Sequence, residues 1–475
     1  VAAGAFVRRA KDYFDDLADH FTAYELNYKL MGHTIAKKLL SHLQDGTALD
    51  PVTEIPNDGF RFQFPNLVYK ENRTLNMLTI QSPSTGALLR MRPHFKELTG
   101  IDMQISVLPY EDLYEQIKLT CQSSYYDLIR MDVAWMSGLG DATYLPLEPY
   151  ENELQCILDS LVSGTRPYYT HASRFCSLPF DPSVLICLYR KDLFEDALLK
   201  RTYYEMYHEN LEIPNTFEKY NQVAAFFTQS INPASPTRYG CTQTYGSAAV
   251  AACDFMPRLL CFTDDLTDSG GNIQIMTPQA LKALELYLEL KPCTSGRESQ
   301  WWGDSVREFT SGSTAMTITF SNHASDTINS KYSNVVGKLG QAIVPGGHPM
   351  LGGGIIGIAK RSKKVQECLE FFKWYYHPDV SGAITLLGGL SPNKAIYKNQ
   401  DATSLFPWLS ESRSSFTIGT RKISPNMSPK FDLKKFEYIL GSAVKNAANG
   451  TMSPKQALEY AQSLYDIQFN KKTAD

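Results

Sequence analysis

The sequence predicts an α/β fold in which helices cover a parallel sheet. Strand-like and helix-like stretches alternate from Leu75 onward, and only short loops separate them. Apolar residues make up 43% of the chain and aromatic residues 12%, which is enough for a buried core and excludes global disorder. The 475 residues correspond to about three ordinary domains, or to one two-lobed domain with an additional piece.

The strands and helices expected in the first half of the chain indicate where a ligand site would lie. In such a sheet, ligands bind beyond the carboxyl ends of the strands. The loops expected at 82–86 and 132–136 follow two of these ends. The strands are expected at 75–80, 101–108 and 126–131, with helices at 87–98 and 110–121 between them.

The same alternation continues in the second half of the chain. Thr216 or Asn215 is expected to cap a helix that begins at Phe217, because their side-chain oxygens accept hydrogen bonds from free helical N–H groups. Helices dominate from Leu433 to the end. Further strands are expected at 183–189, 315–320, 339–344 and 354–359, and a further helix at 362–376.

Residues 1–74 follow a different pattern and are expected to form a separate N-terminal segment. An amphipathic helix is predicted at 29–45, with Gly46 as its C-terminal stop. A proline-punctuated stretch at 47–66 follows. The chain opens at Val1 without a visible signal peptide, so we expect either that one was removed or, as the favoured interpretation, that the chain is cut from a longer protein.

Charge and hydropathy exclude two classes of function. The net charge of −4 argues against a nucleic-acid surface on this chain, and no stretch approaches the roughly 18 uncharged apolar residues of a membrane-spanning helix. The nine cysteines are odd in number and lack metal-ligand spacing, so we expect free, buried thiols and no metal site. Scattered free thiols favour a reducing compartment.

No motif in the chain indicates an enzyme or a cofactor. The run Gly352–Gly357 has the form G-x-G-x-x-G, but it is expected to precede a strand and not a helix. Its glycines therefore indicate a close backbone approach to a ligand or a hinge. Asp127 and Asp132 stand about 16 Å apart at 3.3 Å per residue of strand, too far for a pair of hydrolase carboxylates. We expect no cofactor and no catalysis.

The tryptophans indicate a binding surface. Trp301 and Trp302 are adjacent in a polar stretch and cannot both point inward if that stretch is extended. At least one of them is therefore a candidate platform for a ligand to stack on. Trp135 follows a strand end, where core packing and ligand stacking are both open.

Several segments taken together resemble a known family. They include the strand at 75–80, Tyr126-Asp127-Leu128-Ile129, 185–194, Ile213-Pro214-Asn215-Thr216-Phe217, 309–316, Val344-Pro345-Gly346 and Gly352-Gly353-Gly354. In their order and spacing these segments are similar to those of the extracellular solute-binding proteins of sugar ABC transporters, the maltose-binding-like group. The resemblance implies a two-lobed periplasmic-binding-protein fold (type II-like) with a hinge, which closes over a sugar and has no catalytic activity.

The resemblance also implies lobe boundaries and binding residues. Lobe 1 is expected at 75–182 plus 350–390, and lobe 2 at 183–349 plus 391–475. Sugar sites in the family combine aromatic platforms with carboxylate and amide groups, which suit the apolar faces and hydroxyl rims of a sugar. The residues implied are Ser84, Thr85, Asp132, Trp135, Phe180, Asp181, Tyr245, Trp301, Trp302, Asn322, Gly352 and Gly353.

Residues 1–74 resemble something else, the last helix and tail of a lactose-repressor-type sensor domain. The similarity lies in Leu30-Met31-Gly32-His33-Thr34 and in Ala36, Leu39, Leu40 and Gly46. It implies that the chain is the sugar-sensing part of a larger cytoplasmic transcriptional regulator, with any DNA-binding region upstream of this chain.

A second hypothesis remains open besides that of a sugar sensor within a regulator. The chain would then be an extracellular receptor, held at the membrane through a removed lipid anchor, that delivers a mono- or oligosaccharide to an ABC permease.

Overall fold

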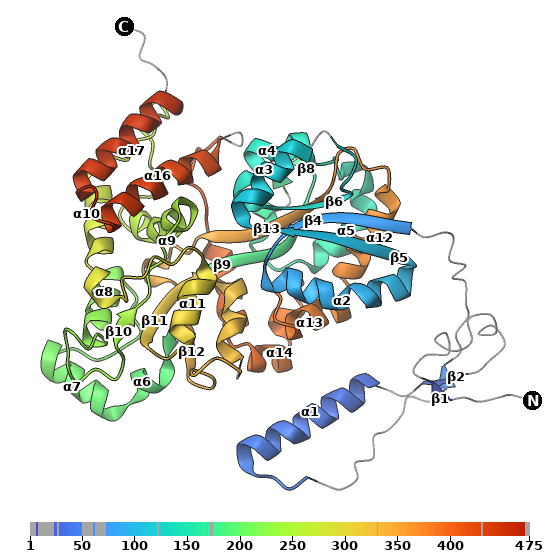
Figure 1. Ribbon diagram of the computed structural model, residues 1–475, viewed down its shortest axis with the longest axis horizontal. Helices are drawn as coiled ribbons and strands as arrows, with labels where there is room; N and C mark the ends of the chain where they lie inside the picture. Colours follow the sequence, from blue (N-terminus) through green and yellow to red (C-terminus); the bar gives the residue numbers. More distant parts are fainter. Residues whose placement is uncertain are drawn as a thin grey trace, which may run out of the picture. The chain divides into compact units, whose positions relative to one another are not determined.

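The computed structural model describes residues 6–7, 23–25, 28–49, 60–61, 73–120, 123–168, 170–171, 174–329, 331–428 and 431–470. The chain divides into two compact units, Val1–Asn72 and Arg73–Asp475 (Figure 1). The second unit alternates strands and helices, which confirms the predicted α/β class.

The first unit contains one helix and a small sheet. Helix α1 (Tyr28–Asp45) confirms the helix expected at 29–45, and Gly46 ends it with a φ of 67°. Strand β2 (Ala23–Glu25) pairs parallel with β1 (Phe6–Val7) and antiparallel with β3 (Phe60–Arg61). Most of the proline-punctuated stretch at 47–66 lies outside the described residues.

Three parallel strands begin the second unit. Strand β4 (Arg73–Ile80) lies between β5 (Ile101–Leu108) and β6 (Leu128–Asp132), and the crossovers run through α2 (Pro83–Thr99) and α3 (Tyr110–Thr120). We call this group lobe A. It is completed by helices α4 (Met136–Thr143), α5 (Glu151–Ser160), α12 (Val365–Tyr375) and α13 (Pro378–Leu386).

A long strand leads from lobe A into a second group of strands. The first half of β9 (Leu178–Arg190) pairs antiparallel with β13 (Leu351–Ile358), which pairs antiparallel with β6. The second half of β9 pairs antiparallel with β11 (Thr314–Phe320) and β12 (Leu339–Ala342). The predicted parallel sheet is confirmed for β4, β5 and β6. The whole sheet is mixed, because β9 and β13 return through it in the opposite direction.

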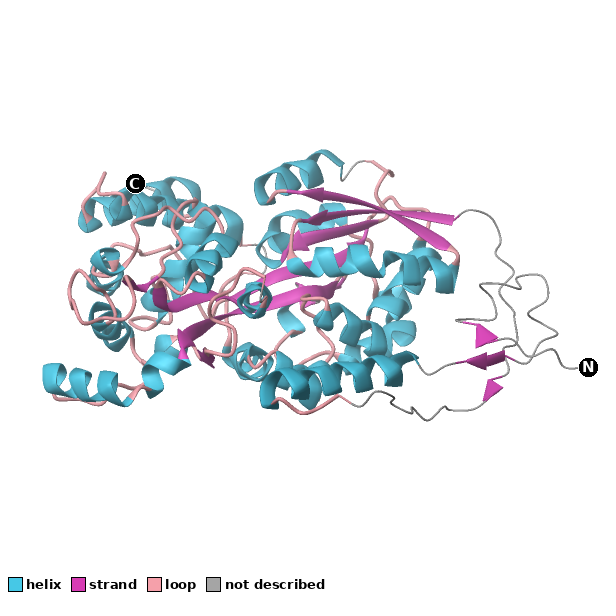
Figure 2. Ribbon diagram, turned by 60° about the horizontal axis from the view of Figure 1, so that its bottom comes forward, coloured by secondary structure: helices cyan, strands magenta, loops and turns pink. Residues whose placement is uncertain are grey.

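The second group of strands forms lobe B. Strand β10 (Tyr239–Cys241) pairs parallel with β11 at the edge of the sheet. Figure 2 shows the strands of the sheet running through the middle of the second unit with helices on both sides. The helices of lobe B are α6 (Lys191–Glu195), α7 (Ala197–Tyr207), α8 (Phe217–Phe226), α9 (Ala248–Leu260), α10 (Pro278–Leu288), α11 (Trp302–Thr310), α16 (Leu433–Ala448) and α17 (Pro454–Gln468).

The remaining elements are short or lie along β9. Helix α15 (Trp408–Ile418) packs on β9 and β12, and α14 (Gln400–Leu405) packs on α15. Strands β7 (Thr170–His171) and β8 (Arg174–Phe175) form a small hairpin-like pair. The helix predicted at Phe217 is confirmed, and Thr216 caps it by accepting a hydrogen bond from the Lys219 backbone N–H at 3.2 Å.

Two local predictions near the candidate site are wrong. Residues 82–86 are not a loop, because α2 begins at Pro83 and Ser82 Oγ caps it by accepting from the Thr85 backbone N–H at 3.1 Å. Proline is compatible with the first helical position, where its missing N–H would have no partner. Gly352, Gly353 and Gly354 do not precede a strand but lie inside β13.

Candidate functional site

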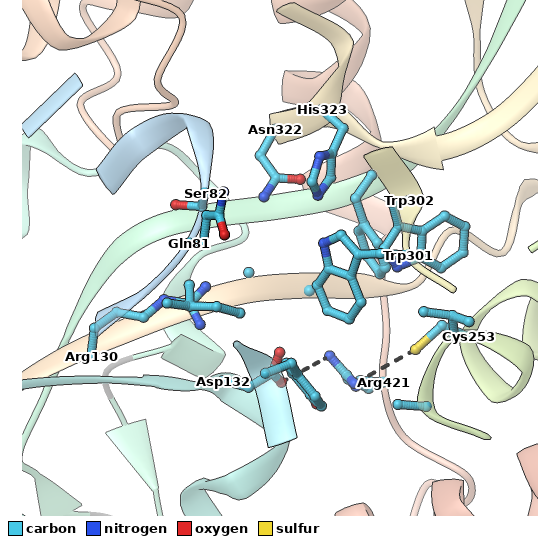
Figure 3. A pocket seen from close by; sticks show the side chains of 17 residues that line it. Gln81, Ser82, Arg130, Asp132, Cys253, Trp301, Trp302, Asn322, His323 and Arg421 are labelled. Carbon is cyan, nitrogen blue, oxygen red and sulfur yellow. Dashed lines mark hydrogen bonds and ion pairs between the residues drawn. The ribbon is translucent and has the colours of Figure 1, made fainter. Parts of the chain in front are cut away.

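A cleft lies between the two lobes, at the carboxyl ends of the strands of lobe A. Its empty volume is about 550 Å³, which includes space open to solvent. Lobe A lines it with Ile80, Gln81, Ser82, Tyr110, Arg130 and Asp132. The rest of the lining comes from β13, with Gly352 and Gly353, and from Ala249, Val250, Cys253, Trp301, Trp302, Phe320, Asn322, His323 and Arg421 (Figure 3).

Strand β6 supplies a buried ion pair to one wall of the cleft. Arg130 donates from Nε and Nη2 to Oδ1 of Asp181 on β9, at 3.1 and 2.9 Å. The two side chains are 3% and 0% exposed, so this pair is shielded from solvent. A buried charge is tolerated when it is paired and hydrogen-bonded, and Asp181 fulfils that condition for Arg130.

A second ionic network joins lobe A to α16 of lobe B. Asp132 Oδ1 accepts from Arg421 Nη1 at 3.3 Å, and Arg421 donates from Nε and Nη2 to the two carboxylate oxygens of Glu437 at 2.7 and 2.8 Å. Burial alone would lower the pKa of Arg421, but Glu437, Cys253 and Asp132 raise that pKa well above its usual value. Arg421 is therefore a permanent charge that connects the two lobes beneath the cleft.

Trp301 forms an aromatic wall on the lobe B side. It stands at the start of α11, where Asp304 Oδ2 accepts a hydrogen bond from its backbone N–H at 3.1 Å. Its half-buried ring lies 5.1 Å from the Tyr110 ring and 6.4 Å from the His323 ring, centroid to centroid. The next residue, Trp302, is buried and meets Phe320 edge to face at 5.1 Å.

Neutral polar groups complete the lining. Asn322 Oδ1 accepts a hydrogen bond from Ser183 Oγ at 3.0 Å, which holds the amide at the edge of the cleft. Burial lowers the pKa of His323 to about 4, so its ring is neutral at pH 7. The cleft therefore offers both hydrogen-bond donors and hydrogen-bond acceptors beside an aromatic face.

The structure brings part of the predicted binding set together. Among the predicted residues, those that line the cleft are Asp132, Trp301, Trp302, Asn322, Gly352 and Gly353. Their contact with a ligand stays a prediction. They come from both lobes and from the strand that joins them, and this arrangement supports a site that assembles when the lobes meet.

The other predicted residues are buried away from the cleft lining. Ser84 Oγ accepts from the Leu390 backbone N–H at 2.9 Å, and Thr85 exchanges a hydrogen bond with Thr79 at 3.1 Å. These two are turned inward because residues 82–86 are helical and do not form an open loop.

Aromatic residues in this second set pack into the core of each lobe. Phe180 stacks on Tyr375 at 4.8 Å, and Tyr245 is 3% exposed. Trp135 is 1% exposed and donates from Nε1 to the hydroxyl of Tyr110 at 3.1 Å. Asp181, also outside the lining, accepts a hydrogen bond from Arg130 Nη2. Trp135 and Asp181 therefore position residues of the lining without belonging to it.

Several lining residues were not predicted from the sequence. Arg130 carried a usable signal, because a charged residue inside the apolar stretch Leu128–Asp132 must be paired or functional. Arg421 carried none, because it meets Asp132 across 289 residues of sequence. Ser82 lies in the segment 82–86 that was expected at the site. The other unpredicted lining residues are Ile80, Gln81, Tyr110, Ala249, Val250, Cys253, Phe320 and His323.

The described part of the chain contains no group of three or more His, Cys, Asp or Glu side chains placed to hold a metal ion. Within the same residues, no helix has the length and apolar character of a membrane span. The described cysteines are free, and most are buried. Cys121 lies outside the described residues.

Residues 91–405 match the family described as bacterial extracellular solute-binding protein. The chain belongs to this family. The predicted family is thus confirmed, and so is the prediction that the chain is not an enzyme, because the family binds solutes. No curated protein matches this solute-binding protein.

Solved structures show the same two-lobed fold. An ABC transporter solute-binding protein from Agrobacterium radiobacter, in complex with ribitol, is 22% identical with a TM-score of 0.72, over 84% of this chain and 99% of the other. A maltose-bound protein of T. maritima is 19% identical with a TM-score of 0.70, over 83% and 99%. A solute-binding protein from Agrobacterium vitis with bound D-mannitol is 19% identical with a TM-score of 0.69, over 83% and 98%.

The expected cytoplasmic location is wrong, because the family to which this solute-binding protein belongs is extracellular. The free thiols misled the prediction. A buried thiol behaves as a small apolar side chain and is inert in any compartment, and burial raises the pKa of Cys187 to about 12. The comparisons also give no support to a transcriptional regulator or to an upstream DNA-binding region.

Proposed function

We propose that this protein is the substrate-binding receptor of an ABC transporter and that its ligand is a sugar or a polyol. One observation carries the proposal. The indole of Trp301 faces Arg130 and Asp132 across the cleft (Figure 3). An aromatic face opposite charged hydrogen-bonding groups suits a ligand that has an apolar carbon skeleton and a rim of hydroxyl groups.

The size of the cleft agrees with a small solute. Ligand pockets commonly span about 300–1,000 Å³, and the empty volume here is about 550 Å³ with its open space included. Proteins with the same fold were solved with ribitol, maltose and D-mannitol. These three compounds are therefore the first probes to test.

The hinge follows from the two strands that join the lobes. We propose lobe 1 at 75–182 plus 350–390 and lobe 2 at 183–349 plus 391–475, with residues 1–74 outside both. The boundary falls within β9 and beside β13, the strands that pass between the groups. The Trp301 and Tyr110 rings already touch across the lobes, with centroids 5.1 Å apart, so opening at this hinge would separate them to admit the ligand and closing would seal it from solvent.

Calorimetric titration tests the function. Ribitol, D-mannitol and maltose are each titrated into the protein, and thermal unfolding is followed in parallel. A ligand at about 100 times its dissociation constant should add about 2.7 kcal/mol of stability, a shift of several degrees. Absence of both heat and shift for every probe would rule out the sugar or polyol receptor.

A further inference from the structure

The buried Arg130 leaves one of its hydrogen-bond donors without a partner. Its Nε and Nη2 are both used by Asp181 Oδ1, and the other oxygen of Asp181 accepts from Ser82 Oγ at 3.4 Å. Nη1 is buried and has no hydrogen-bond partner in the described part of the chain. A buried donor without a partner is costly, so a group that enters the cleft to accept from Nη1 removes that cost.

The guanidinium is held rigidly where it faces the cleft. Gly354 of β13 lies directly against it, and a Cβ added there would fall 2.0 Å from Arg130 Nε and 2.5 Å from Nη2. Only glycine lets the strand pass this closely. Figure 3 shows the guanidinium pointing from β6 toward the middle of the cleft. Asp181 and Gly354 hold the Nε and Nη2 side of the guanidinium, so Nη1 is the nitrogen of this cleft-lining side chain that remains for a ligand.

Asp132 adds an acceptor beside this donor. Residues two apart on a strand share a face, so Arg130 and Asp132 of β6 both reach the cleft. Oδ1 of Asp132 accepts from the Ala134 backbone N–H and from Arg421. Oδ2 makes no hydrogen bond within the described residues and is available to a hydroxyl that donates.

The charges around the cleft are not balanced. The linked groups are the guanidiniums of Arg130 and Arg421 and the carboxylates of Asp132, Asp181 and Glu437, which leaves one net negative charge. An acidic ligand would bring a second uncompensated negative charge into this poorly solvated site, at a high desolvation cost. A neutral ligand leaves the balance unchanged.

From these contacts we propose that Arg130 Nη1 and Asp132 Oδ2 form a donor–acceptor pair that selects neutral polyols and sugars against the corresponding sugar acids. One ligand hydroxyl accepts from Nη1 and another donates to Oδ2. The proposal rests on the proposed function, because it assigns the ligand chemistry of that same cleft.

Matched neutral and acidic probes test the selection on the unaltered protein. The pairs are ribitol with ribonate, D-mannitol with D-mannonate, and maltose with maltobionate, each titrated by calorimetry at pH 7.5. For a pair whose neutral member binds, that member should bind at least 100-fold more tightly than its acid. Equal or tighter binding of the acid overturns the proposal.

Two variants locate the selection in these residues. Asp132→Asn removes a negative charge from the cleft and should shift the neutral-to-acid affinity ratio at least tenfold toward the acid. The double variant Arg130→Gln/Asp181→Asn keeps a hydrogen-bonded buried pair but removes Nη1, and it should weaken binding of the neutral probe at least tenfold. An unchanged ratio in the first and an unchanged affinity in the second would each contradict the proposal.

A matched control distinguishes a loss of ligand selection from a non-specific effect of substitution on the protein. Arg174→Gln breaks the exposed ion pair with Asp141 in the same lobe and should leave affinity and ratio unchanged. Thermal unfolding shows whether each variant is folded, and Asp132→Asn alone suffices if the double variant is not. Failure of every probe to bind the unaltered protein overturns the receptor function and this selection together, whereas binding without discrimination overturns the selection only.

Discussion

The ring of Trp301 lies 5.1 Å from the ring of Tyr110, centroid to centroid, although the two residues belong to different lobes. Trp135 supports Tyr110 from lobe A, with ring centroids 4.7 Å apart and a hydrogen bond to the Tyr110 hydroxyl. The contact between Trp301 and Tyr110 therefore closes one side of the cleft. If Trp301 is the proposed ligand platform, we expect it to act as one only while the lobes are together.

Trp301→Ala should weaken binding of the sugar or polyol by about 1–3 kcal/mol, because the variant loses the stacking face. Its effect on the unfolding temperature should be small, since the ring is half-buried at the start of α11. Trp302→Ala is the matched comparison. This ring is 3% exposed, so its removal should cost about 3–5 kcal/mol of stability. Calorimetry and thermal unfolding on both variants check this, and equal affinity of Trp301→Ala and the unaltered protein would refute the platform.

Arg421→Met should destabilise the protein by about 3–5 kcal/mol, because it leaves Asp132 and Glu437 as carboxylates without their guanidinium. The double variant Arg421→Met/Glu437→Leu should recover part of this loss, since it removes one of the unpaired charges. Chemical denaturation measures both variants and also Glu437→Leu alone. If the double variant is less stable than the unaltered protein by the sum of the two single losses, Arg421 and Glu437 are not coupled and the expected recovery is refuted.

The repeating strand–helix pattern could be predicted from the sequence because apolar spacing depends on local geometry. Strand β5 begins and ends where the pattern places it, and α3 begins at the predicted residue, while its predicted last residue, Cys121, lies outside the described part. The errors lie where a proline or a glycine, residue types that usually interrupt helices and strands, stands inside a regular element. Pro83 starts α2, and the glycines of β13 continue a strand, because the first helical position and a crowded strand tolerate these residues.

Only part of the site could be predicted, for a related reason. Trp301 and Asp132 follow local signals, an aromatic in a polar stretch and a carboxylate at a strand end. Arg130 becomes meaningful only once Asp181 is known to occupy two of its donors. Arg421 reaches the cleft through contacts between distant segments, which no local pattern encodes.

Gly353→Ala should destabilise the protein by more than about 1 kcal/mol, since φ at this position is 82° and an added Cβ would lie 2.1 Å from the Asp181 carbonyl oxygen. Gly86→Ala is the control. It lies within α2 with nothing within 4 Å of the added Cβ, so it should stabilise the protein by about 0.5–1 kcal/mol. Denaturant titration distinguishes the two signs, and a neutral Gly353→Ala would show that β9 and β13 can separate at this point.

His323 should make the stability of the protein depend on pH. Burial lowers the pKa of its ring from 6.5 to about 4. Above pH 6.5 the ring is neutral in both the folded and the unfolded chain. As the pH falls from 6.5 toward 4, the unfolded chain binds a proton that the folded chain does not, so stability decreases.

Between pH 7.5 and pH 5.0 this difference amounts to about 2 kcal/mol. The unaltered protein should therefore lose about 2 kcal/mol more than His323→Gln over that interval, as measured by denaturant unfolding at both values. Ligand affinity should stay constant over the same interval, because the folded ring remains neutral. If the two proteins lose stability in parallel, His323 is protonated as readily in the folded chain as in the unfolded one, and its neutral place beside Trp301 is refuted.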